Sequence, residues 1–140
     1  MASRSSEDPP PRPVGHDQIG AQLQAPILRF HLAAEVEHLK QQDAWWGSKG
    51  PSSTTLVKHP DLRVVLVAIR KGDRLPEHRT AARITVHTLS GHIRLHLPAS
   101  AEDLPAGHVL VLDRELHHDV EALEDSSFLL TLAWPREDCL

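Results

Sequence analysis

The sequence predicts a mainly β, single-domain protein: an antiparallel sandwich or barrel with one helix near its N-terminus. Three observations predict this fold class. After Gly50-Pro51, short apolar runs alternate with turn residues, as in antiparallel sheets. No helical pattern separates these runs, which argues against a parallel fold of alternating strands and helices. A length of 140 residues, with 40% hydrophobic and 24% charged residues, suits one globular domain.

The two ends of the chain are predicted to lie outside the folded core. Residues 1–25 are predicted to form a disordered N-terminal arm, because several prolines fix the backbone and the polar neighbours offer nothing to bury. Residues 136–140 are predicted to form a C-terminal tail.

Residues 26–50 are predicted to supply a helix that packs on the barrel. Within them, residues 30–44 place Leu32, Val36 and Leu39 at positions i, i+4 and i+7. Residues at this spacing share one face of a helix, so we expect that face to be buried.

Residues 51–135 are predicted to form the barrel. Alternation is clearest where Ile93 and Leu95 are interleaved with His92 and His96, so the apolar set is expected to face the core and the histidines to face solvent. The predicted strands are residues 54–58, 63–70, 84–89, 92–97, 109–112, 120–123 and 128–134.

Composition and charge exclude several classes of protein. The single cysteine, Cys139, excludes an internal disulfide framework and a thiolate-rich zinc site. A net charge of −4 argues against a nucleic-acid partner, because phosphate binding needs a basic face. No apolar run approaches the roughly 20 residues that cross a membrane, and residues 1–13 lack the apolar segment of a secretory signal. A cytoplasmic location is therefore expected.

Two segments combine glycine and histidine at a regular spacing. In the first, Gly72 is followed by five residues and then by His78, and Gly91 closes the segment. In the second, Gly107 is followed by HVLVL, DRE and LH, and then by His118.

These two segments resemble the two motifs of the cupin superfamily. The first motif has a second histidine and a glutamate after its first histidine, and this chain has Thr80 and Ile84 there. The second motif ends in an asparagine where this chain has Ala122. His78 and His118 match ligand histidines of the family. The resemblance covers residues 72–134 and implies a cupin-type, RmlC-like antiparallel jelly-roll barrel.

The resemblance also implies a site at the mouth of the barrel. In cupins the three histidines and the glutamate hold a transition metal, and here only His78 and His118 remain as metal ligands. We predict that a divalent transition metal (Fe, Mn, Ni, Zn or Cu) is weakly held or absent, since catalytic zinc sites, for comparison, usually keep three protein ligands. Strand parity predicts that Thr80, Ile84 and Val86 line the pocket.

From the residues alone, each histidine keeps a second interpretation. His78 could be an exposed residue after Pro76, and His118 could be a hydrogen-bonded histidine without a metal. His117 should face away from His118, because adjacent strand residues point to opposite faces.

Three functions remain open at this point. The first is a small cupin that binds a small molecule, with or without a metal, and without strong catalysis. The second is a metal-dependent enzyme, of the dioxygenase or isomerase type, that uses His78 and His118; its catalytic residues are unknown. The third is a structural barrel with a vestigial site. The resemblance and the edge strands of the predicted sheets favour a homodimer.

Overall fold

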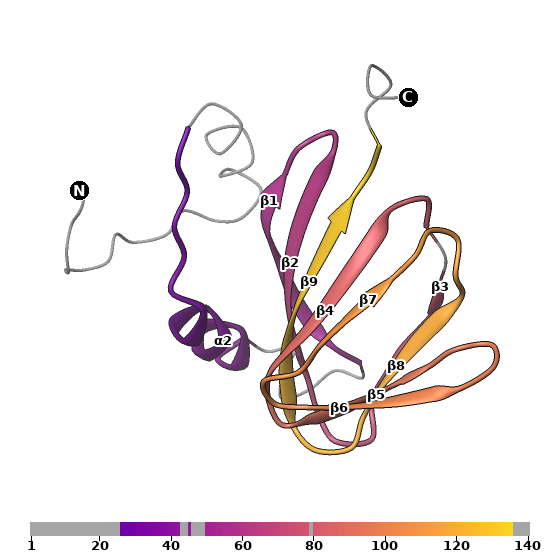
Figure 1. The fold of residues 1–140 in the computed structure, drawn as a ribbon. Helices are drawn as coiled ribbons and strands as arrows, with labels where there is room; N and C mark the ends of the chain where they lie inside the picture. Colours follow the sequence, from indigo (N-terminus) through magenta and orange to yellow (C-terminus); the bar gives the residue numbers. More distant parts are fainter. Residues whose placement is uncertain (1–25, 43–44, 46–49, 79, 136–140) are drawn as a thin grey trace.

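In the part of the chain that the structure describes, the fold consists of two antiparallel sheets and helix α2 (Leu32–Lys40) (Figure 1). The structure, a computed structural model, describes residues 26–42, 45, 50–78 and 80–135, without the side chains of residues 77 and 78. The predicted arm 1–25 and tail 136–140 lie outside these residues. The mainly β, antiparallel fold class is confirmed.

Each sheet combines one pair of consecutive strands with strands that are distant in sequence. The five-stranded sheet has the order β1 (Ser52–Lys58), β2 (Leu62–Ile69), β9 (Ser126–Ala133), β4 (Arg83–Ser90) and β7 (Val109–Leu112). The four-stranded sheet has the order β3 (Arg74–His78), β8 (His118–Ala122), β5 (His92–His96) and β6 (Ala101–Pro105).

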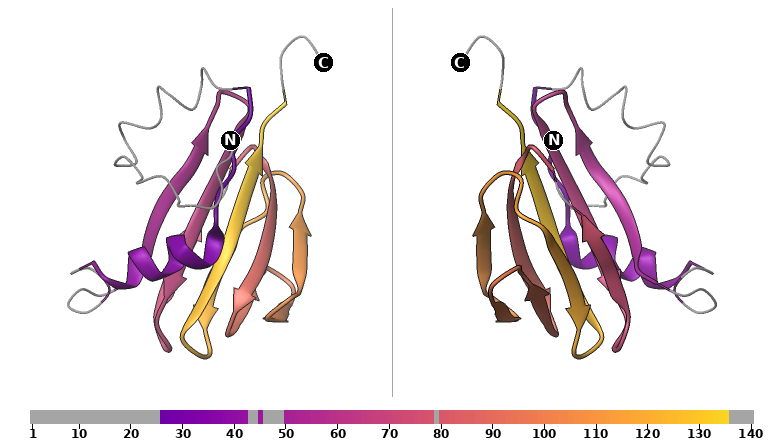
Figure 2. Two further views of the ribbon diagram at one scale, coloured as in Figure 1. Left: turned by 90° about the vertical axis from the view of Figure 1, so that its left-hand side faces the viewer. Right: turned by 90° about the vertical axis from the view of Figure 1, so that its right-hand side faces the viewer.

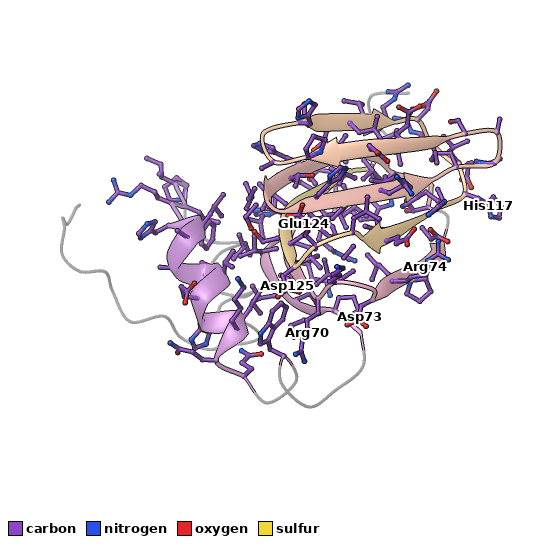
Figure 3. All side chains as sticks on the ribbon, turned by 90° about the horizontal axis from the view of Figure 1, so that it is seen from below. Arg70, Asp73, Arg74, His117, Glu124 and Asp125 are labelled. Carbon is purple, nitrogen blue, oxygen red and sulfur yellow. The ribbon has the colours of Figure 1, made fainter. Side chains whose placement is uncertain are left out.

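The two ends of the barrel differ. Short connections at residues 70–73, 91, 106–108 and 123–125 join one sheet to the other at the closed end, the lower end in Figure 1. Backbone bonds and one side chain tie these connections together: the Lys71 amide donates to Asp125 Oδ1 at 2.8 Å, and the Gly72 amide donates to the Ala122 carbonyl at 2.9 Å. Figure 3 views this end, with Asp125 labelled.

At the other end, which we call the open end, the two sheets diverge (Figure 1). The connections there are residues 59–61, 79–82, 97–100 and 113–117.

One hydrophobic core fills the space between the sheets. It alternates along the strands, so that Ile84 and Val86 of β4 and Phe128 of β9 point inward and are at most 1% exposed. Burying side chains of this size stabilises the fold by about 1.5–3 kcal/mol each.

A second core lies on the outer face of the five-stranded sheet, under helix α2 (Leu32–Lys40) (Figure 2). Val36 and Leu39 of the helix are buried there against Leu66 of β2, and Leu32 packs at the margin, as the helical spacing predicts. The helix is shorter than the predicted 30–44: His31, which precedes it, is extended, and Gln41 follows it as the C-cap.

Two strands were missed by the sequence pattern, β3 and β6. Each contains a proline, Pro76 and Pro105 respectively, and neither segment is among the predicted strands. Proline cannot donate a ladder hydrogen bond, and it is therefore found on edge strands. β3 and β6 are the two edges of the four-stranded sheet, so both prolines are compatible with the observed pairing.

Candidate functional site

His118 is a buried polar side chain at the open end of the four-stranded sheet. It begins β8, in which His118, Val120 and Ala122 face the core while Asp119 and Glu121 face outward. His118 is 2% exposed, whereas His117 is exposed and points away from the barrel (Figure 3). The predicted opposition of these two adjacent histidines is confirmed.

The imidazole of His118 is oriented by the chain just before it. Its Nδ1 lies 3.0 Å from the Leu116 carbonyl oxygen, and because a carbonyl can only accept, Nδ1–H is the donor. In the neutral ring this bond leaves the lone pair on Nε2. A histidine held in this way is prepared to bind a metal or to accept a hydrogen bond from a ligand.

A bulge in β3 sets which residue stands opposite His118. The pairs Arg74–Glu121 and Leu75–Val120 set a register that, if continued, would bring residue 77 opposite His118. An irregularity between Leu75 and His78 shifts the register by one residue, so that His78 is the partner. Directly opposed residues of an antiparallel pair have Cα atoms about 4.5–5.5 Å apart. The backbone therefore brings His78 and His118 together in adjacent strands.

The three predicted pocket-lining residues have different environments. Ile84 and Val86 are 1% and 0% exposed and belong to the core between the sheets. Thr80 is half-buried, its Oγ1 accepts a hydrogen bond from the Ala82 amide at 3.3 Å, and its carbonyl accepts one from the Glu115 amide at 2.9 Å. Thr80 thus joins two connections of the open end.

The donor set at this end does not match a complete cupin metal site. Among the described residues, no group of three or more His, Cys, Asp or Glu side chains is placed to hold a metal ion. Ile84, at the position of the family's glutamate, is packed in the core and has no donor atom. A metal here would depend on two imidazoles, those of His78 and His118.

His92 and His96 lie on the outer face of the four-stranded sheet, as predicted, and both are engaged with carboxylates. His96 Nε2 is 2.7 Å from Glu121 Oε1, and His92 Nε2 is 3.7 Å from Asp103 Oδ2. The hydrogen bond from His96, followed by the charge of Arg74, lowers the pKa of Glu121.

Asp103 has a similar environment on this outer face. Its hydrogen bond from Arg94, together with the charges of Arg94 and His92, lowers the pKa of Asp103. These contacts give His92 and His96 a place in a surface charge network, away from the interior that holds His118.

The inner face of the open end also carries a cation, Arg63, that the sequence pattern did not predict. Arg63 of β2 occupies an inward-facing position beside Leu132 of β9, and its guanidinium carbon lies 5.2 Å from the centre of the Trp134 ring. One sequence feature could have indicated this position. The turn residues Pro60-Asp61 predict a tight hairpin, and a hairpin closed there pairs Arg63 with Lys58.

Comparisons with known proteins agree with the observed architecture. No family model and no curated protein matches the sequence. A conserved protein of unknown function from Streptococcus pyogenes has a similar structure, with a TM-score of 0.66 and 22% identity over 82% of this chain and 93% of that one.

Two further structures are described as cupins. A cupin superfamily protein from Desulfitobacterium hafniense has a TM-score of 0.59 and 15% identity, covering 61% of this chain and 78% of its own. An RmlC-like cupin from Shewanella frigidimarina has a TM-score of 0.57 and 18% identity, covering 65% and 82%. The chain has the cupin fold. Within the described residues, no helix is long and apolar enough to span a membrane.

Proposed function

We propose that this cupin-fold protein binds a small molecule at the open end of its barrel, without strong catalysis. The observation that carries the proposal is His118: a buried imidazole, facing the interior near the open end, whose orientation is fixed by the Leu116 carbonyl. Ligand-binding interiors are mostly apolar and carry a small number of precisely placed polar groups, and His118 is such a group.

We also propose that a divalent transition metal binds weakly at this end, with His78 and His118 as its protein ligands. When bound, such an ion acts as a Lewis acid toward a carbonyl or carboxylate group. The chain's own part is to present Nε2 of His118 as a neutral donor and to bring His78 opposite it on β3. Catalytic zinc sites usually have three protein ligands, so two imidazoles favour weak binding over turnover.

Metal uptake by the untagged protein tests the role of the two histidines. We expect Ni²⁺ or Zn²⁺ to bind at one equivalent, and His118→Ala and His78→Ala to lose this binding. The matched controls are His92→Ala and His96→Ala, which remove imidazoles from the outer face and should retain it. Because metals bind neutral imidazole, uptake should weaken as the pH falls through about 6.5.

The outcomes separate the competing functions. Equal losses in all four variants would mean that surface histidines bind the metal, and this would overturn a site at His78 and His118. A tightly bound metal with turnover of an added substrate would favour the enzyme. A protein that takes up no metal and binds nothing from a chemically diverse small-molecule set in melting assays would instead be a structural barrel.

We also propose that the chain forms a homodimer through β7. This strand ends the five-stranded sheet, and Val109 and Val111 on its outer face are 58% and 65% exposed. An edge strand with apolar side chains favours pairing with another strand. Antiparallel pairing about Leu110 would place Val109 beside Val111 of the partner subunit, on a shared face.

Sedimentation at micromolar concentration tests this assembly. The wild type should sediment as a dimer of the 15.6 kDa chain. Val111→Lys should be monomeric, and Thr85→Lys, on the neighbouring strand β4, is a control for added charge on the same face. A monomeric wild type would contradict the proposal.

A further inference from the structure

We infer that the small molecule bound at the open end carries a carboxylate, and that Arg63 and Lys58 recognise it. This inference rests on the proposed function and adds the chemical class of the ligand. It depends on three observations: the position of Arg63, the state of its guanidinium, and the residue opposite it.

Arg63 faces the interior of the barrel near the open end. Along β2, Val65 and Val67 belong to or pack against the core between the sheets, and Arg63 continues the same alternation toward the open end. It pairs with Leu132 of β9, which in turn pairs with Ile84 of β4. Arg63 is therefore the charged end member of an otherwise apolar row of inward-facing side chains.

Arg63 and His118 lie at the same end of the barrel, in different sheets. β2 and β9 of one sheet are joined to β3 and β8 of the other by the connections 70–73 and 123–125, so these strand pairs stack across the core. Arg63 and His118 both lie at the strand ends remote from these connections.

The guanidinium of Arg63 has an unmet hydrogen-bonding group. Its Nε is buried and has no acceptor, and no ion pair of Arg63 occurs in the part of the chain that the structure describes. Other arginines differ: Arg83 lies 3.2 Å from Asp113 and Arg74 lies 3.6 Å from Asp119. The Trp134 ring, 5.2 Å from the guanidinium carbon of Arg63, holds the charge in place without neutralising it.

Lys58 places a second positive charge directly opposite Arg63. The hairpin closes with His59 and Leu62 exchanging two backbone hydrogen bonds, of 2.8 and 3.4 Å. The next pair outward, Lys58 and Arg63, is therefore a non-hydrogen-bonded pair, the type in which side chains lie closest. Like charges at opposed positions are destabilising. An anion between them would remove this repulsion.

The surroundings favour a carboxylate on an apolar body. The planar guanidinium matches the two oxygens of a carboxylate with paired hydrogen bonds. The neighbour in the same row, Leu132, is only partly buried and offers apolar contact for the rest of the molecule. The open end also contains Arg114, whose Nε is likewise buried without an acceptor.

Titration with benzoate and with its neutral analogue benzamide tests the inference. Binding is followed through the Nε–H resonance of Arg63 and the indole N–H resonance of Trp134 in ¹H–¹⁵N spectra. We expect saturable binding of benzoate and at least about tenfold weaker binding of benzamide, as expected for loss of a charge-assisted pair. Added salt should weaken benzoate binding.

Three variants identify the residues. Arg63→Gln should weaken benzoate binding by about tenfold or more, whereas Arg83→Gln, at the same end but paired with Asp113, should leave it within about twofold. Lys58→Glu should raise the melting temperature of the free protein, because it replaces repulsion by attraction, and should also weaken benzoate binding. The gain in stability shows that this variant is folded.

Three results would overturn the inference that the ligand carries a carboxylate bound by Arg63. Equal affinities for benzoate and benzamide would overturn the carboxylate inference and leave small-molecule binding at the open end intact. Inorganic phosphate that binds as tightly as benzoate, with the same loss in Arg63→Gln, would assign the site to phosphate and overturn the inference. Benzoate binding unchanged in Arg63→Gln would overturn it as well.

Discussion

Replacing Gly91 by alanine is expected to be strongly destabilising, because two connections approach each other there. Gly91 joins β4 to β5 at the closed end and has φ of 83°, a conformation that L side chains rarely adopt. A Cβ added at this position would lie within 3.0 Å of the Asp125 carbonyl oxygen and of Ser126, including its Cα at 2.8 Å. The obstacle is mainly backbone, so it cannot be relieved by a rotamer change.

Two contributions add in the free energy of unfolding. A left-handed backbone conformation costs a residue with a Cβ about 1–2 kcal/mol. Forcing apart the close contact with the 123–125 connection costs about 1–3 kcal/mol more, as in overpacked interiors. Gly91→Ala should therefore lose about 2–5 kcal/mol, a large part of the roughly 5–15 kcal/mol typical of a domain.

The chain offers two matched controls. Gly72 and Gly107 have φ of 89° and 88°, almost the same as Gly91, but an added Cβ would meet nothing within 4 Å at either position. Gly72→Ala and Gly107→Ala should therefore lose only the conformational part, about 1–2 kcal/mol. The difference between these variants and Gly91→Ala measures the close approach alone.

Urea unfolding, followed by far-ultraviolet circular dichroism, gives the three free energies with a common m-value if unfolding is two-state. The free energy of unfolding of Gly91→Ala should be well below those of Gly72→Ala and Gly107→Ala. If all three variants lose the same free energy within about 0.5 kcal/mol, the approach of the two connections is looser than described and the reasoning is refuted.

Two further predictions concern neighbouring polar groups. Ser126→Ala should cost about 1–3 kcal/mol in urea unfolding, because the buried Ser126 Oγ accepts a bond from the His92 amide at 2.9 Å and donates one to the Glu124 carbonyl at 2.8 Å; a loss below about 0.5 kcal/mol would contradict this role. The lowered pKa of Glu121 means that its contribution to stability is present above its ordinary value of 4.5 and is lost as the pH falls through the lower folded-state pKa. Glu121→Gln should therefore flatten the dependence of unfolding free energy on pH in this acid range, and an unchanged slope would mean that the contact with His96 contributes nothing.

Most of the strand pattern could be predicted from the sequence because inward and outward residues alternate clearly. β7, for example, has the predicted bounds, and β5 differs by one residue. β3 and β6 could not be predicted in this way, since Pro76 and Pro105 are read as turn residues when the edge position of a strand is unknown. Edge positions are a property of the assembled sheet, and local pattern does not contain them.

In the candidate site, too, some features follow from the local sequence pattern and others only from the assembled sheet. The inward direction of His118 follows from strand parity, and the structure confirms it. The pairing of His78 with His118 depends on a bulge in β3, without which residue 77 would be opposite. A bulge shifts register by one residue and changes which side chain has a given partner. Arg63 could not be predicted as a site residue from the glycine–histidine motifs, because it lies before them in the sequence.

The two ends of the barrel have different physical requirements, and this is the strongest reason to place binding at one of them. At the closed end, backbone of the 123–125 connection packs against Gly91, and hydrogen bonds to Asp125 and Ser126 satisfy the connections, so little can change there without loss of stability. At the open end, Arg63 retains a buried Nε without an acceptor and stands opposite another cation. Arrangements that lower the stability of the free protein are found where a ligand compensates them. A ligand that satisfies Arg63 would stabilise the folded state by mass action, so the same residue accounts for the local cost and for the proposed binding.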